Sequence, residues 1–96
     1  MPKYDTLPGF MREFNKLSHE QQQLFLEAVR AIIVSLRLTQ KLPGSPLIKK
    51  MTDYEIYEVR WAPNGRATFH LEPDPSGNEM IVVWRHIGGH EIYKHP

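Results

Sequence analysis

Apolar residues recur at helical spacing in the first third of the chain. Phe10, Phe14 and Leu17 lie four and three residues apart, which predicts one face of a short helix that opens after Pro8. A longer helix is predicted from Ser18, because Ser18 and Gln21 have the spacing of a capping box. Its apolar stripe must be covered by another layer and consists of Leu24, Phe25, Ala28, Val29, Ile32, Ile33 and Leu36. We expect the two helices to form an antiparallel hairpin.

The pattern changes to short alternating runs after residue 40. KLPGSPLIKKM, residues 41–51, contains two prolines and a glycine and is interpreted as a connector, since a helix cannot continue through it. YEIYEVRWA and RATFHLE predict a strand hairpin, with PNG supplying left-handed conformations at Asn64 and Gly65. DPSGN predicts a second turn. EMIVVWRHI is typical of a central strand covered on both faces, and HEIYKH predicts a last short strand after Gly88 and Gly89.

Alternation along the predicted hairpin assigns its two faces, because residues two apart on a strand point the same way. The core-facing set is Tyr57, Val59, Trp61, Ala67, Phe69 and Leu71. The opposite, polar set is Glu58, Arg60, Arg66, Thr68, His70 and Glu72. Arg60 and Arg66 are therefore expected on an exposed face opposite the helices. The direction of Arg85 stays open, because its run is apolar on both parities.

Composition limits the molecule to one domain, residues 1–96, with room for a single small core. Twelve basic and 11 acidic residues give a net charge of +1, so any nucleic-acid role needs a local cluster of basic residues. The absence of cysteine excludes disulfides and thiolate chemistry and fits a reducing compartment. Neither a signal peptide nor a membrane-spanning run is evident, so we expect a soluble, cytoplasmic protein without a membrane partner.

Guanidinium and imidazole groups on the polar hairpin face are suited to binding phosphate and moving protons. A solvated surface of mixed charge is the competing interpretation. A metal site is not expected, because the four-residue offset of His86 and His90 spans about 13 Å on an extended strand and no acidic cluster completes a ligand set. The tryptophans are interpreted as core residues in preference to base-stacking ones, and His19 and His95 as surface residues.

The order of these segments resembles the RelE/ParE superfamily of toxins from bacterial toxin–antitoxin pairs, over nearly the whole chain. The strongest parts are the hairpin Y-x-V-R-W … G-R-A-x-F and the closing V-W-R-H-I-G-G-H-E-I-Y. The resemblance implies an α+β fold in which an amino-terminal helix hairpin packs on one face of a small, mainly antiparallel, twisted sheet. A cognate antitoxin protein is implied as the partner.

For the RelE branch, the resemblance implies a ribosome-dependent endoribonuclease (mRNA interferase) without a cofactor, in which the ribose 2′-hydroxyl attacks the adjacent phosphate. Arg66 matches the family's phosphate-stabilising arginine, Tyr93 a proton-transfer tyrosine, and His90 falls near a second family arginine. The remaining candidates are His70 for proton transfer and Arg60, Arg85, Lys49 and Lys50 for binding the RNA phosphates.

Two features depart from the nuclease pattern. Glu58 stands where strongly active members tend to have a basic residue, and a carboxylate there repels phosphate unless it pairs with Arg60 or Arg66. The net charge of +1 is also low for a protein that must bind ribosomal RNA. The alternatives are therefore a ParE-type toxin that inhibits DNA gyrase, or an inactive homologue that only binds an antitoxin. Arg66→Ala is expected to be structurally mild.

Overall fold

The computed structural model describes residues 3–39, 48–51, 55–77, 80–89, 92 and 96. Both predicted helices are confirmed, as α1 (Phe10–Asn15) and α2 (His19–Thr39). The capping box at the start of α2 is formed: the Gln21 N–H donates to Ser18 Oγ at 3.1 Å, and the Ser18 N–H donates to Gln21 Oε1 at 2.9 Å. These two bonds satisfy backbone donors that the first helical turn leaves unpaired.

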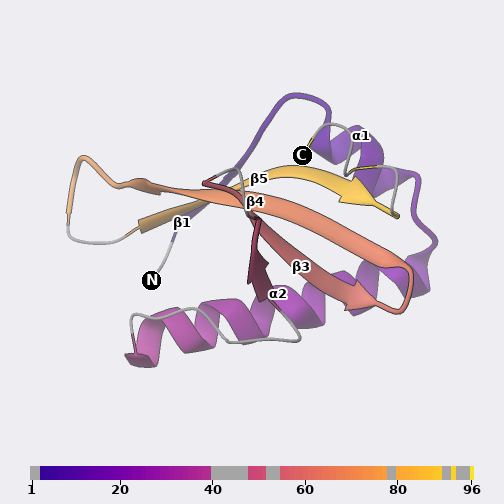
Figure 1. Ribbon diagram of the computed structural model, residues 1–96, viewed down its shortest axis with the longest axis horizontal. Coiled ribbons are helices and arrows are strands. Elements are labelled where there is room, and N and C mark those ends of the chain that lie inside the picture. The colour runs from indigo at the N-terminus through magenta and orange to yellow at the C-terminus, as the bar shows by residue number, and fades with distance from the viewer. Residues whose placement is uncertain (1–2, 40–47, 52–54, 78–79, 90–91, 93–95) are drawn as a thin grey trace.

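Five strands form one sheet in the spatial order β1-β5-β4-β3-β2. They are β1 (Lys3–Thr6), β2 (Ile48–Lys50), β3 (Tyr57–Ala62), β4 (Gly65–Pro73) and β5 (Met80–Gly88). Only the β1–β5 pair is parallel among the described strands. As Figure 1 shows, α2 runs along one side of the curved sheet and α1 lies close to β5. The predicted α+β class, with helices on one face of a mainly antiparallel sheet, is confirmed.

Two strands were not predicted. β1 precedes the first helix and pairs with β5, which is distant in sequence, and β2 occupies part of the segment interpreted as a connector. Both are edge strands, of four and three residues, and are too short to show a period-two pattern. The local sequence of β1 and β2 does not predict a strand; each becomes one by pairing with a neighbouring strand, β5 or β3.

The core lies between the helices and the sheet and contains a cluster of aromatic rings. Phe25 of α2 is at its centre, with its ring centroid 4.9 Å from that of Trp84 and 6.4 Å from that of Trp61. Phe10 of α1 packs against the same phenylalanine at 6.0 Å. Both tryptophans are buried, so their interpretation as core residues is confirmed.

The β3–β4 turn forms where predicted, but its geometry differs. Gly65 does not have a positive φ and is the first residue of β4, paired with Ala62, so the expected left-handed conformation at Gly65 is wrong. The need for glycine is steric instead: a Cβ at residue 65 would lie 2.6 Å from Cε2 of Trp61. The indole ring therefore lies directly against the backbone of the turn.

The carboxyl-terminal strand expected at residues 90–95 falls largely outside the described residues. Ile92, which is described, donates its N–H to the Gly89 carbonyl at 3.3 Å, as in a turn. In the described part of the chain, neither helix is both long and apolar enough to span a bilayer.

Candidate functional site

The face of the sheet opposite the helices, called the open face below, carries an ordered row of polar side chains. Strand pairing places Lys49 of β2 opposite Glu58 of β3, Glu58 opposite Thr68 of β4, and Thr68 opposite His86 of β5. Arg60 and Arg66 face each other one step along the hairpin. The predicted hairpin set is thus gathered on one face, and His86 joins it from β5.

Arg66 is on this face but is not exposed, which corrects the expectation from alternation. Arg66 is only 3% exposed. Its Nη1 donates to the carbonyls of Ala62, Pro63 and Gly65 at 3.1, 3.2 and 2.8 Å. Its Nε lies 3.5 Å from Oε1 of Glu58, which is itself largely buried. The guanidinium therefore fastens the β3–β4 turn, and Arg66→Ala cannot be structurally mild.

The other cations of the hairpin side do not form one cluster. Arg60 is exposed, opposite Arg66. Lys49 and Lys50 are adjacent on β2 and so point to opposite faces; Lys50 pairs with Tyr57, on the helix side. The Lys50 Nζ lies 3.1 Å from Oε2 of Glu55, and this hydrogen bond and charge raise the pKa of Lys50 above its usual value. Of the cations on β2 and β3, Lys49 and Arg60 are therefore the two exposed on the open face.

A register shift in the β4–β5 ladder decides the direction of Arg85. Thr68 pairs with His86 but Phe69 pairs with Trp84, which leaves Arg85 as the extra residue of a β-bulge. Trp84 points into the core. Arg85 instead hydrogen-bonds with His70, and His86 pairs with Thr68, so both lie on the open face. The bulge thus places two consecutive polar side chains, Arg85 and His86, on the same side of the sheet.

Arg85 belongs to a chain of hydrogen bonds along the open face. Its Nη1 lies 2.9 Å from Nδ1 of His70, whose Nε2 lies 2.8 Å from Oε1 of Glu72. Arginine can only donate, so Nδ1 of His70 is the acceptor and its Nε2 carries the hydrogen that Glu72 accepts. Both nitrogens of His70 are therefore already bonded.

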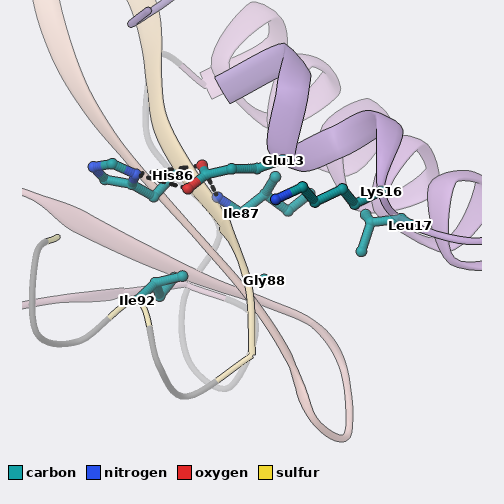
Figure 2. Close-up of a pocket in the computed structure, with 7 residues that line it drawn as sticks. All are labelled: Glu13, Lys16, Leu17, His86, Ile87, Gly88 and Ile92. Carbon is teal, nitrogen blue, oxygen red and sulfur yellow. Dashed lines mark hydrogen bonds and ion pairs between the residues drawn. The ribbon is translucent and has the colours of Figure 1, made fainter. Parts of the chain in front are cut away.

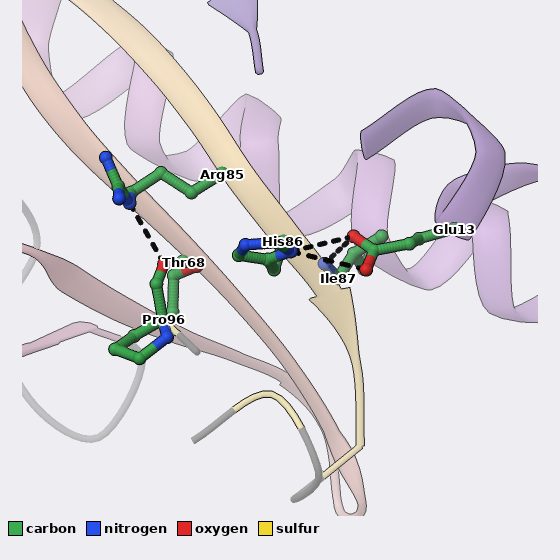
Figure 3. Close-up of polar contacts among 6 residues, drawn as sticks. All are labelled: Glu13, Thr68, Arg85, His86, Ile87 and Pro96. Atoms are coloured by element: carbon green, nitrogen blue, oxygen red, sulfur yellow. Dashed lines mark hydrogen bonds and ion pairs between the residues drawn. The ribbon is translucent and has the colours of Figure 1, made fainter. Parts of the chain in front are cut away.

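Two donors of this face meet at one oxygen. Arg85 Nε donates to the backbone oxygen of Pro96 at 2.9 Å, and the Thr68 hydroxyl donates to the same atom at 3.2 Å (Figure 3). Thr68 is fully buried and Pro96 is also buried. A guanidinium and a hydroxyl thus converge on one acceptor oxygen, and in this structure that acceptor is the backbone oxygen of Pro96. We call this place the oxygen position.

His86 and Glu13 form a further pair that the sequence did not reveal. Both carboxylate oxygens of Glu13 lie 3.3 Å from Nδ1 of His86, and Oε1 accepts the Ile87 N–H at 3.2 Å. A cavity of about 370 Å³ lies beside them, and Figure 2 draws the residues that line it. Its lining residues are Glu13, Lys16, Leu17, His86, Ile87, Gly88 and Ile92.

The other predicted site residues, His90 and Tyr93, lie outside the described residues, and so does His95. His19 is exposed, as expected of a surface residue. In the part of the chain that the structure describes, no three His, Asp or Glu side chains gather closely enough to hold a metal ion.

No protein-family model and no curated protein sequence matches the chain. Solved toxin structures do match it in fold. The YoeB/ParE toxin from Agrobacterium tumefaciens superposes with a TM-score of 0.65 at 11% identity, covering 92% of this chain and 98% of that chain. A chain of the RelB-RelE antitoxin-toxin complex from Methanococcus jannaschii gives 0.59 at 18% identity, covering 96% and 99%. YafQ from E. coli gives 0.58 at 9% identity, covering 97% and 98%. The chain has the RelE/ParE toxin fold.

Proposed function

We propose that this protein is the toxin of a bacterial toxin–antitoxin pair and acts in the cytoplasm as a ribosome-dependent mRNA endonuclease. The observation that carries the proposal is the oxygen position between Arg85 and Thr68 on the open face of a RelE/ParE-type sheet. A phosphate oxygen of RNA fits this position, because a guanidinium and a hydroxyl are donors that phosphate accepts.

The remaining open-face residues extend this position into an RNA-binding surface. Arg60 and Lys49 are exposed and would contact neighbouring phosphates. Arg66 contributes positive charge from below the surface, where Glu58 partly neutralises it. His90 and Tyr93 stay proton-transfer candidates, as the resemblance implies. His70 is proposed to orient Arg85, since both of its ring nitrogens are bonded.

A cognate antitoxin is proposed as the protein partner, because the matching chain from Methanococcus jannaschii comes from an antitoxin-toxin complex. The open face is the surface such a partner has to cover in order to block RNA. The hydrogen bond to the backbone oxygen of Pro96 supports this idea, since a peptide carbonyl of a partner could take the same position.

The test is messenger integrity in a reconstituted translation reaction, read by primer extension. Wild-type protein should produce cuts within translated codons. Arg85→Gln should abolish them, whereas the matched control Arg12→Gln, at an exposed position on α1, should not. Intact messenger with undisturbed translation in the wild-type reaction would overturn the proposal.

A second candidate, a gyrase-directed toxin of ParE type, is favoured by one specific observation. The arginine that would stabilise the phosphate in a nuclease is here buried and paired with Glu58. A protein that does not cleave RNA has no need of an exposed guanidinium at that position. Inhibition of DNA supercoiling by purified gyrase, together with intact messenger, would support this candidate.

A further inference from the structure

Glu13 completes an edge of the sheet that β1 leaves unpaired. The ladder between β1 and β5 ends at the pair Thr6 and Trp84, followed by one bond from the Leu7 N–H to the Trp84 carbonyl. Beyond this point, the Ile87 N–H of β5 donates to the Glu13 carboxylate instead of to a strand (Figure 2). Because the backbone of β5 fixes one carboxylate oxygen, the side chain is held in place against the neighbouring His86 ring.

The Glu13 carboxylate determines which nitrogen of His86 carries a hydrogen. A carboxylate can only accept, so the hydrogen of the neutral ring lies on Nδ1, 3.3 Å from each oxygen. Nε2 then presents a lone pair, and no described residue hydrogen-bonds to it. His70 differs, because both of its nitrogens are used by Arg85 and Glu72. Of these two histidines, His86 is the one equipped to accept a proton.

His86 also lies beside the oxygen position. It is the direct cross-strand neighbour of Thr68, whose hydroxyl helps Arg85 to hold the Pro96 oxygen. Opposed residues on adjacent strands have Cβ atoms about 5 Å apart, within reach of an imidazole. Figure 3 shows the His86 ring with Nδ1 turned toward Glu13 and its other edge turned away from it. A phosphate bound in place of the Pro96 oxygen would therefore bring its ribose close to this ring.

We propose that His86 takes the proton of the attacking 2′-hydroxyl and that Glu13 is its positioning residue; the inference rests on the proposed nuclease function. The 2′ O–H bond breaks and its proton passes to Nε2, while the 2′-oxygen bonds to phosphorus and the bond from phosphorus to the 5′-oxygen breaks. The leaving 5′-oxygen takes a proton from water. The imidazolium formed is stabilised by the Glu13 carboxylate at Nδ1.

The first test reads the tautomer of His86 by ¹⁵N NMR of the imidazole and requires no activity. The wild-type ring should carry its hydrogen on Nδ1. In Glu13→Gln, the amide oxygen can still accept the Ile87 N–H while the amide nitrogen donates to Nδ1, so the hydrogen should move to Nε2 with the fold retained. An unchanged tautomer in this variant, or Nε2–H in the wild type, would overturn the positioning role of Glu13.

The second test measures single-turnover cleavage of ribosome-bound messenger. His86→Ala should lower the cleavage rate by roughly 10²- to 10⁴-fold, the usual contribution of a general base, with little change in half-saturating protein concentration. Added imidazole should restore part of the rate, because the side chain of His86 is 31% exposed and the vacated space is accessible. Glu13→Gln should show a comparable loss, and the exposed control His19→Ala should keep the wild-type rate.

The outcomes separate the two levels of the proposal. If the wild type leaves messenger intact, the nuclease function fails, whatever the tautomer. If the wild type cuts and His86→Ala, shown to be folded by its NMR spectrum, cuts equally fast, the nuclease stands and the role of His86 is overturned. A loss that imidazole does not relieve, in a folded His86→Ala protein, would likewise assign His86 a structural role.

Discussion

At the scale of single residues, Arg66 shows why alternation predicts a face but not exposure. Its place on the open face follows from the period of the strand, yet its side chain turns back along the chain to the carbonyls of its own turn. Whether the guanidinium is exposed depends on the groups around it, here the turn carbonyls and Glu58, and alternation along the strand does not predict those contacts. The same limit applies to Glu13 and His86, since nothing in the local sequence links residues 73 apart.

Arg66→Ala should lower the free energy of unfolding by about 3–5 kcal/mol, the usual effect of removing one partner of a buried ion pair. Three turn carbonyls lose a donor, and Glu58, which is largely buried, loses the Arg66 cation. Urea denaturation monitored by tryptophan fluorescence measures the change. Its control is Arg60→Ala on the neighbouring strand, where the exposed side chain predicts a change within about 0.5 kcal/mol. Equal effects in the two variants would contradict the clamping role of Arg66.

The burial of Arg66 limits what a loss of activity in Arg66→Ala can show. A folded Arg66→Ala protein cannot be assumed, so loss of toxicity in that variant does not identify a catalytic arginine. Arg85→Gln is the sharper probe, because Arg85 is only partly buried and its partners are His70 and the Pro96 oxygen.

At the scale of elements, those with a strong local signal were predicted and those defined by pairing were not. The capping box and helical spacing predicted α1 and α2, and PNG predicted the β3–β4 hairpin. β1 and β2 exist only through partners elsewhere in the chain. The bulge at Arg85 is likewise a property of the β4–β5 pair, which is why its direction was undecided from sequence.

Gly65→Ala should destabilise the hairpin by about 1–3 kcal/mol, because the added methyl group meets the rigid ring of Trp61. Thermal unfolding followed by circular dichroism measures the loss. Gly77→Ala is the matched control, since nothing lies within 4 Å of the position that a Cβ would take at residue 77. A Gly65→Ala protein as stable as the wild type would show that the indole moves aside easily.

Ser18→Ala should cost about 1 kcal/mol, because it removes the oxygen that accepts the Gln21 N–H at the start of α2. Chemical denaturation measures the difference, with the exposed Gln23→Ala substitution as control. A loss confined to Ser18→Ala supports the cap as an independent source of stability. Equal stability of the two variants would show that packing, and not the Ser18 cap, stabilises the start of α2.

At the scale of the whole molecule, a chain with a net charge of only +1 still carries several hydrogen-bond donors on the open face of its sheet. Charges of both signs are spread over the chain, but four donors share the open face from four different strands: Lys49 of β2, Arg60 of β3, Thr68 of β4 and Arg85 of β5. Composition could not predict this gathering. The resemblance implied the fold, whereas the partner of each side chain required the folded structure.

Removing His95 and Pro96 should open the oxygen position while leaving the sheet folded. Inorganic phosphate should then bind roughly tenfold more tightly, because the Pro96 oxygen no longer competes for Arg85. A tenfold change corresponds to about 1.4 kcal/mol of binding free energy. Titration of phosphate, followed through the ¹⁵N shift of Arg85 Nε, measures both affinities. The variant Arg85→Gln in the shortened protein should abolish the gain. Unchanged affinity on shortening would mean that the Pro96 oxygen does not compete for Arg85.

The burial of Pro96 against Thr68 and Arg85 has a practical side for anyone who purifies or labels this protein. An affinity tag or fluorescent fusion joined after Pro96 would leave from the middle of the open face and stand over the surface that RNA is proposed to reach. Under the proposed function, RNA-cleavage assays on a chain extended after Pro96 would therefore underestimate the activity of the protein without the extension.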